Sequence, residues 1–94
     1  MGVSAINHKA RKLDKRLRKY GLARRQFYAI LEDQHFQCDI CTLRIDTESC
    51  QIDHNHRTGL VRGLLCGRCN QGLGNFRDNP EIVRYAEQYL RKWE

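Results

Sequence analysis

The sequence contains no long apolar run, and no apolar segment follows Met1. A secretory signal peptide and a membrane-spanning helix both need such a run, so we expect a cytoplasmic protein without a membrane partner. Internal repeats and low-complexity segments are absent too. A chain of 94 residues allows one domain with a modest core. Domains of this size usually need disulfides or a structural metal.

Acidic residues are scarce in the first third of the chain. Residues 1–31 contain nine Lys and Arg and a single acid, Asp14, whereas residues 32–94 contain eight basic and ten acidic residues. A concentrated basic segment in a chain of net charge +6 favours a polyanionic partner. A solvated amphipathic helix without a partner, or a helix lying on an anionic membrane, would have the same composition. Neither alternative accounts for the centre of the chain.

Helical periodicity marks both ends of the sequence. Apolar residues recur every three or four positions over residues 4–19, which predicts a helix that Gly21 ends. A second helix is predicted over about residues 23–33, burying Phe27, Ile30 and Leu31. The pair Asn79-Pro80 is a helix-start signal and predicts a last helix over residues 80–92.

The centre of the chain has the pattern of a β-hairpin. Two short β-prone runs, residues 50–54 and 60–65, flank a turn that ends in Gly59. We expect the hairpin to bury Ile52, Leu60, Leu64 and Leu65 in part. After it, Asn70 is suited to cap and open a short helix, because its side-chain oxygen can accept from free backbone N–H groups.

Four of the five cysteines form two Cys-x-x-Cys pairs, Cys38/Cys41 and Cys66/Cys69, separated by 24 residues. Four thiolates at this spacing match structural zinc, and a reducing compartment favours metal over disulfides. An iron site or a redox pair would use the same spacing. Cys50 has no partner at such a spacing, and we interpret it as a small buried residue.

The tetrapeptide Asp53-His54-Asn55-His56 lies between the two cysteine pairs. Asp is a hard oxygen ligand for Mg²⁺, and His can accept a proton near neutral pH. Side chains alternate along a strand, so the joint use of Asp53 and His54 requires the strand to bend or end there. In the plainer alternative, His54 or His56 completes a zinc site or caps the turn. Four cysteines already satisfy zinc, which favours the first interpretation.

Two strings of residues resemble the recombination endonuclease VII family of phages. One runs from Tyr20-Gly21-Leu22 through Gln34 to Cys38-x-x-Cys41. The other is Asp53-His54-x-His56-x-Thr58-Gly59-x-Val61-Arg62-Gly63-Leu64-Leu65-Cys66-x-x-Cys69-Asn70-x-Gly72-Leu73-Gly74. The resemblance, over about residues 19–90, implies a small α+β fold. Its ββα-metal (His-Me finger, HNH-type) core would be held by a four-cysteine zinc site and flanked by N-terminal and C-terminal helices.

The resemblance also implies a phage or host-cell DNA endonuclease or nickase. Asp53 and Asn70 would hold a catalytic Mg²⁺ or Mn²⁺, His54 would be the general base, and His56 would be a supporting residue. Arg62 would contact the phosphate, with an ordinary surface arginine as the alternative. The competing functions are a non-catalytic zinc-containing DNA-binding module and, more distantly, a thiol redox or iron–sulfur protein.

We expect residues 1–20 to be a DNA-contacting arm and residues 21–94 to be the nuclease domain. The phosphate contacts expected on the arm are Lys9, Arg11, Lys12, Lys15, Arg16, Arg18 and Lys19. The partner would be duplex or branched DNA, bound by a monomer or a dimer. Three positions depart from the family: Ala23 replaces a frequent Thr helix cap, Arg25 replaces a common acidic residue, and His35 replaces a frequent Gly. The members that resolve junctions are longer and dimerise through extra helices.

Overall fold

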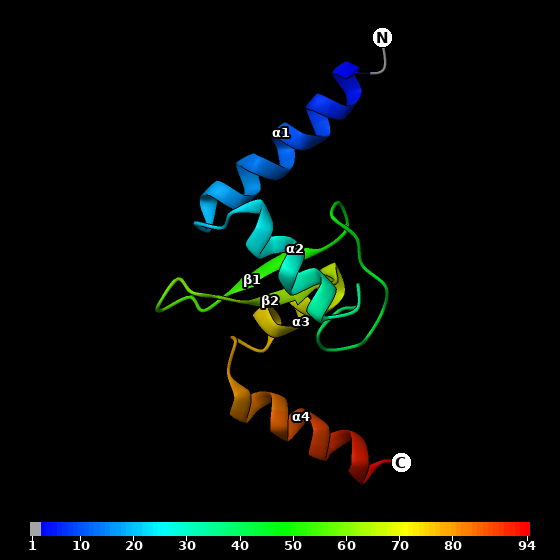
Figure 1. The fold of residues 1–94 in the computed structure, drawn as a ribbon. Helices are drawn as coiled ribbons and strands as arrows, with labels where there is room; N and C mark the ends of the chain where they lie inside the picture. Colours follow the sequence, from blue (N-terminus) through cyan, green and yellow to red (C-terminus); the bar gives the residue numbers. More distant parts are fainter. Residues whose placement is uncertain (1–2) are drawn as a thin grey trace.

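The structure, a computed structural model, describes the backbone of residues 3–94 and the side chains of residues 11–94. Figure 1 shows the sheet with α2 and α3 at the centre, while α1 and α4 extend in opposite directions over a length of 57 Å. No helix in the described part of the chain is both long and apolar enough to cross a membrane. In chain order the elements are α1 (Val3–Lys19), α2 (Arg24–Asp33), β1 (Gln51–His54), β2 (Val61–Leu65), α3 (Gly67–Asn75) and α4 (Pro80–Lys92).

The corner between α1 and α2 follows the predicted pattern. Gly21 has a φ of 67°, which favours glycine, and it ends α1 as expected. Asp14 and Arg24 join the two helices through an ion pair of 2.7 Å. At the start of α2 the Ala23 side chain accepts no hydrogen bond, although its backbone N–H donates to Gln26 Oε1 at 2.8 Å. Only the half of a capping box that Gln26 supplies is therefore present at the start of α2.

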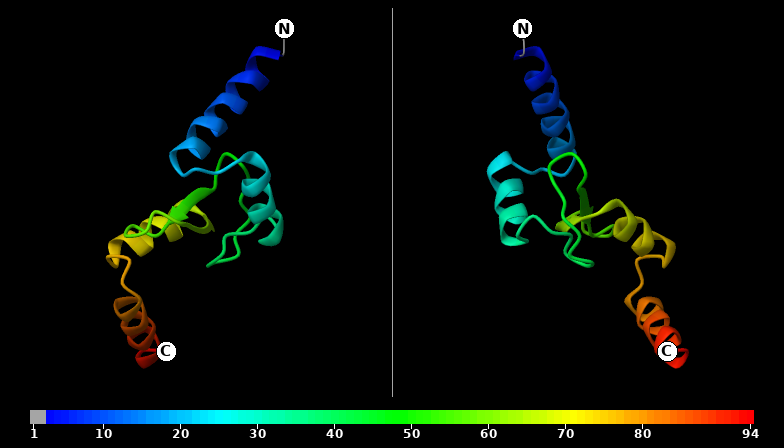
Figure 2. Two further views of the ribbon diagram at one scale, coloured as in Figure 1. Left: turned by 60° about the vertical axis from the view of Figure 1, so that its left-hand side comes forward. Right: turned by 90° about the vertical axis from the view of Figure 1, so that its right-hand side faces the viewer.

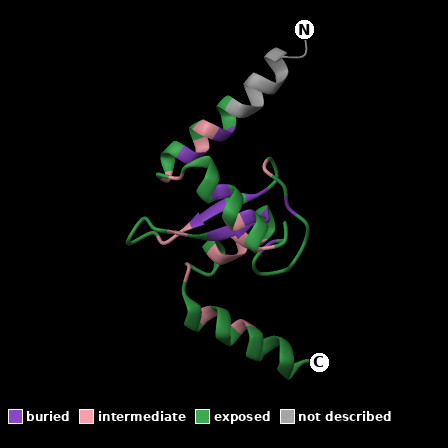
Figure 3. Ribbon diagram, in the orientation of Figure 1, coloured by how far each residue is buried: buried purple, intermediate pink, exposed green. Residues whose placement is uncertain are grey.

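The core lies where α1, α2 and the hairpin meet (Figure 3). Phe27 and Leu31 of α2 are fully buried against Leu64 of β2, and α1 adds Leu13 and Leu17. The predictions for Phe27, Leu31, Ile52, Leu64 and Leu65 are confirmed. Ile30 is only partly buried. The prediction for Leu60 is wrong, because it is 70% exposed at the end of the hairpin loop.

Side chains hold the long segment between α2 and β1 in place. The Gln34 carboxamide accepts from the Leu64 N–H at 2.9 Å and donates to the Leu64 carbonyl at 2.8 Å, so it pairs with β2 as a strand would. His35 has a φ of 55°, which explains why glycine is frequent there in the family. Arg16 of α1 donates to the carbonyls of Thr47 (2.6 Å) and Cys50 (2.8 Å).

The hairpin is antiparallel and contains a β-bulge. Asp53 pairs with Gly63, but the next residue, His54, pairs with Val61, so Arg62 is the extra residue of β2. The Asn55 carboxamide oxygen accepts from two turn N–H groups at 2.8 and 3.0 Å, and Gly59 has a φ of 78°. The predicted bend therefore falls between Asp53 and His54.

The two C-terminal helices begin at different kinds of cap. α3 begins at Gly67, with Cys66 as its N-cap, so the prediction that Asn70 opens this helix is wrong. α4 begins at Pro80 as predicted, because Asn79 Oδ1 accepts from the N–H groups of Glu81 and Ile82. α4 buries no residue completely, and Figures 2 and 3 show it projecting from the rest of the molecule.

Candidate metal centre and active site

Cys38, Cys41, Cys66 and Cys69 come together as the spacing predicted. Their sulfur atoms all lie within 4.8 Å of one another, and the Sγ atoms of Cys41 and Cys66 are 3.7 Å apart. A tetrahedral zinc ion with Zn–S bonds of about 2.3 Å places its sulfur ligands roughly 3.8 Å apart. The cluster therefore brings four sulfur atoms to within about 1 Å of the separations that a structural zinc ion requires.

The surroundings of the cluster favour one thiolate but not four. Burial of the Cys38 thiol opposes its ionisation, but the backbone N–H groups of Cys41, Cys66 and Ile40 outweigh burial and lower its pKa to about 6. Burial, together with hydrogen bonds to the three neighbouring thiols, raises the pKa of Cys69 to about 12. Ionisation of one thiol thus disfavours ionisation of its neighbours, and a cation is needed to stabilise four thiolates together.

The four-cysteine cluster joins segments that are distant in sequence. Cys38 and Cys41 lie on a tight loop closed by a bridge between Gln37 and Arg44. Cys66 lies between β2 and α3 as the N-cap of α3, and its sulfur accepts from the Cys69 N–H at 3.4 Å. Cys50 does not join the cluster and is fully buried, as predicted. Burial raises the pKa of its thiol, with Arg16 acting against that rise.

A separate pocket of about 230 Å³ gathers the predicted catalytic residues. Asp53 and His54 come from the end of β1, His56 from the turn, and Asn70 from the first turns of α3. Although Asn70 does not cap α3, its helical position places it on this pocket. A carboxylate and a carboxamide oxygen are ligands that a hard divalent cation accepts. Tyr20 and Asp78, which the sequence reasoning missed, also line the pocket.

The two histidines of the pocket lie side by side. The ring centroids of His54 and His56 are 4.6 Å apart, and the Tyr20 ring lies 5.1 Å from His54 on another side. Neither histidine belongs to the four-cysteine cluster. The alternative in which one of them completes the zinc site is therefore wrong.

Arg62 is not an unpaired surface arginine, because it forms ion pairs with two carboxylates. Its Nε lies 2.7 Å from Asp53 Oδ2, and its Nη2 lies 2.7 Å from Asp78 Oδ1. The hydrogen bonds from Arg62 hold the pKa of the Asp78 carboxyl below its usual range. The hydrogen bonds that Arg62 donates to Asp53 and then to Asp78 raise the pKa of Arg62 in turn. No sequence signal marks Asp78, because it pairs with a residue 16 positions away.

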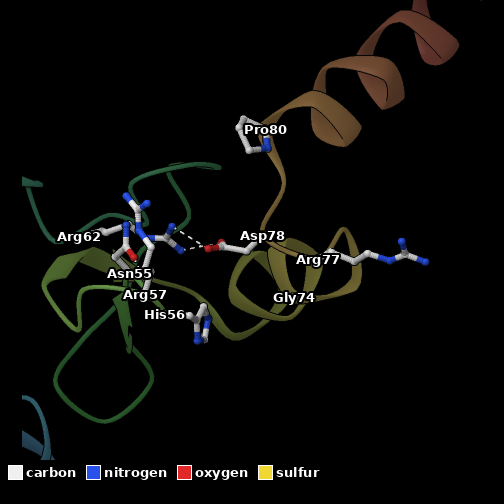
Figure 4. Close-up of a pocket in the computed structure, with 8 residues that line it drawn as sticks. All are labelled: Asn55, His56, Arg57, Arg62, Gly74, Arg77, Asp78 and Pro80. Atoms are coloured by element: carbon white, nitrogen blue, oxygen red, sulfur yellow. Dashed lines mark hydrogen bonds and ion pairs between the residues drawn. The ribbon is translucent and has the colours of Figure 1, made fainter.

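A larger cleft of about 820 Å³ continues from this pocket along the hairpin turn and the segment before α4. Figure 4 shows Arg57 and Arg62 on the hairpin side of the cleft, Asp78 in its middle, and the side chain of Arg77 directed away from it. The pocket and the cleft share His56, Gly74 and Asp78. The candidate cation ligands therefore lie at one end of an open groove that Arg57 and the paired Arg62 line.

The basic residues predicted on the arm fall into two groups. Arg16 is half-buried and bonded to the loop before β1, so it has a structural role and leaves the expected DNA-contacting set. Lys9 lies outside the residues whose side chains are described. The exposed members of the set are Arg11, Lys12, Lys15, Arg18 and Lys19.

A family model decides the relationship: the model of recombination endonuclease VII matches residues 13–92. The chain belongs to the recombination endonuclease VII family. Two curated relatives in this range are the Gene 59 proteins of Mycobacterium phage D29, 42% identical over 78 residues, and of Mycobacterium phage L5, 40% identical over 76 residues. The matches cover 81% and 79% of this chain but 47% and 46% of the relatives. The chain thus spans about half the length of these relatives.

A solved structure supports the same fold. The crystal structure of the ββα-Me type II restriction endonuclease Hpy99I superposes with a TM-score of 0.54 at 42% sequence identity. The similarity covers 63% of this chain and 33% of that one. The hairpin followed by α3 is therefore a ββα-metal core, and the predicted fold class, with helices at both ends, is confirmed.

Proposed function

We propose that this chain carries a divalent-metal-dependent DNA endonuclease site that cuts phosphodiester bonds by hydrolysis. The observation behind the proposal is the pocket in which Asp53, His54 and Asn70 meet. A module that only binds DNA needs no such combination of hard-cation ligands and a proton acceptor. Membership of the endonuclease VII family supports the same conclusion.

His54 is the proposed general base. The β-bulge after Asp53 ends the regular strand, and the rings of Tyr20 and His56 flank the His54 imidazole. An imidazole nitrogen held in this way can take the proton of a water that attacks phosphorus. His56, beside it on the turn, is the proposed supporting residue toward the phosphate.

Asp53 and Asn70 are the proposed ligands of the catalytic cation, Mg²⁺ or Mn²⁺. When bound, such a cation neutralises charge on the phosphate oxygens and stabilises the leaving oxygen. Asp53 sits on β1 and Asn70 on α3, and Cys66 joins β2 to α3 within the proposed zinc site. That site fixes the distance between base and ligands, for which errors of about 1 Å are costly.

DNA is the proposed substrate, with its backbone following the open groove and the basic face of α1. The charge of residues 1–31 and the exposure of the α1 lysines support this path. The proposed division into an arm (residues 1–20) and a nuclease domain (residues 21–94) is one of function and not of folding. Leu13 and Leu17 of α1 lie in the common core, so the arm does not fold as a separate unit.

A plasmid-nicking assay tests the proposal. Zinc-loaded protein is incubated with supercoiled DNA and Mg²⁺, Mn²⁺ or no added divalent cation, and we expect nicking only with Mg²⁺ or Mn²⁺. His54→Ala should lower the rate by about 10²–10⁴-fold, the usual contribution of a general base. The matched control is His35→Asn, which replaces an exposed loop histidine at a φ that Asn tolerates. Binding without metal-dependent cleavage would favour the non-catalytic module, and unchanged nicking by His54→Ala would refute the assigned base.

A further inference from the structure

The Arg62 guanidinium uses two edges to hold two carboxylates. Its Nε and Nη2 donate to the two oxygens of Asp53 at 2.7 and 3.0 Å. Its Nη1 and Nη2 donate to the two oxygens of Asp78 at 2.9 and 2.7 Å. Each pair is bidentate, the geometry that fixes a carboxylate plane most firmly. Figure 4 shows the Asp78 side of this clasp, which we define as Asp53, Arg62 and Asp78.

The backbone directs Arg62 toward Asp53. In a regular hairpin the residue opposite His54 would be Arg62, but the bulge makes Arg62 the extra residue and pairs His54 with Val61. Bulges commonly redirect a side chain in this way. Gly63, the residue opposite Asp53, has a Cβ position only 3.3 Å from Gln34 Oε1, which leaves little room for a side chain.

The backbone also fixes Asp78. Arg77 and Asp78 both have left-handed φ values, 58° and 54°, at the end of α3. The Asp78 N–H donates to the Leu73 carbonyl at 2.7 Å, and the Arg77 N–H donates to the Gly74 carbonyl at 2.9 Å. Asp78 is therefore tied to α3, the helix that carries Asn70. Through Arg62 the clasp connects the hairpin ligand Asp53 with the helix of the second proposed ligand.

The charges of the clasp explain why a second carboxylate is useful. The Asp53 side chain is only 10% exposed, so Arg62 alone would neutralise it in a largely desolvated place. Asp78 shares the guanidinium and leaves the three groups with a net charge of −1. Each carboxylate oxygen has two lone pairs, and Arg62 takes one from each Asp53 oxygen. The other lone pairs stay available to a cation.

We propose that Asp78 is a positioning residue that acts through Arg62 to keep Asp53 oriented and negative enough to bind the divalent cation. The role of that cation in cleavage rests on the proposed function, whereas the clasp itself rests on the geometry above. In Asp78→Asn the positive charge of Arg62 would be balanced by Asp53 alone, which should weaken cation binding by about tenfold. Loss of a hydrogen-bond partner of a metal ligand usually has an effect of this size. In an Arg62→Met background the same change should have little effect, because its intermediary is gone.

A double-mutant cycle on Mn²⁺ affinity tests this coupling. Free Mn²⁺ is measured by electron paramagnetic resonance in titrations of the full zinc-loaded chain without DNA, for the parent, Asp78→Asn, Arg62→Met and the double variant. We expect Asp78→Asn to raise the Mn²⁺ Kd at least five times more in the parent than in the Arg62→Met background. A smaller ratio would overturn the proposal, since Asp78 would then act on the cation directly or not at all.

Control variants distinguish an effect on the clasp from an effect on folding and from failure of the proposed function. Asp53→Asn should abolish the measured Mn²⁺ binding, which assigns the signal to this pocket. Glu87→Gln breaks a comparable arginine pair on α4, at 2.7 Å, and should leave the Kd unchanged. Zinc content and thermal unfolding identify misfolded variants, and Arg62→Gln replaces Arg62→Met if the latter fails. A parent that binds no Mn²⁺ would refute the proposed cation site along with the clasp. Binding with an additive cycle would refute the clasp alone.

Discussion

Removal of zinc should unfold the domain. Eleven apolar or cysteine residues are buried in the described core, and three of them, Cys38, Cys50 and Cys66, are cysteines. A domain of this size has a free energy of unfolding of about 5–14 kcal/mol, from roughly 0.05–0.15 kcal/mol per residue. Structural zinc sites contribute about 10–16 kcal/mol of apparent binding free energy. Loss of the ion therefore removes as much free energy as the whole fold has.

The choice of probe matters for this experiment. Trp93 is the only tryptophan and lies 70% exposed at the end of α4, so its fluorescence reports poorly on the core. Thermal unfolding is therefore followed by far-UV circular dichroism, which reports the secondary structure of the whole chain, with zinc measured by mass spectrometry. We expect a cooperative transition with one zinc per chain, and none after chelation to less than about 0.1 zinc per chain.

The control for the chelation experiment is Cys50→Ala. Cys50 is fully buried yet lies outside the zinc cluster, so this variant should keep its zinc and lose only about 1–2 kcal/mol of stability. An unchanged melting curve in metal-free protein would show that the apolar core suffices alone. A Cys50→Ala protein that loses zinc would show that the ligand set is wrong.

Three further predictions follow from the described side chains. Replacing exposed lysines and an arginine of α1 with Gln should weaken duplex binding in a titration. The slope of log K against log salt should fall in magnitude by about 0.9 for each phosphate that is no longer neutralised. An unchanged slope would show that α1 does not contact the DNA. Arg16→Met should cost about 1–3 kcal/mol in denaturant unfolding, because two loop carbonyls lose their donor; a change below about 0.5 kcal/mol would contradict that role. The Cys50 thiol, whose pKa burial raises, should resist alkylation at pH 7.5 in native protein, and an early native adduct by mass spectrometry would contradict its burial. The residues replaced on α1 are Lys12, Lys15, Arg18 and Lys19.

Sequence patterns that act over a few residues predict the structure correctly. The ends of α1 and α4 follow from Gly21 and from Asn79-Pro80, whose effects are confined to one helical turn. The gathering of four cysteines follows from two short cysteine pairs, because such pairs have few other compatible uses in a reducing compartment. The strand bend is predictable, since Asp53 and His54 could not otherwise serve one site.

Features that depend on contacts between residues distant in sequence could not be predicted from the sequence. The pattern predicts that α3 starts at Asn70, because a cysteine N-cap is recognisable only once the geometry of the zinc knuckle is known. Leu60 is expected to be partly buried, but it lies at the end of the hairpin loop and is exposed. The partners of Arg16 and Arg62 lie far away in sequence, so nothing in the local pattern distinguishes these arginines from surface residues.

The proposed zinc and cation sites are adjacent in the chain, and this adjacency makes them interdependent. Cys69 and Asn70 are consecutive on α3, and Cys66 follows directly on β2, whose Gly63 pairs with Asp53. Displacement of the knuckle would therefore move both proposed cation ligands before it disturbed α1 or α4. The clasp adds a second connection between hairpin and helix, at the opposite end of α3. With α3 held at both ends, the position of Asn70 relative to Asp53 depends on the helix as a rigid body and not on either loop.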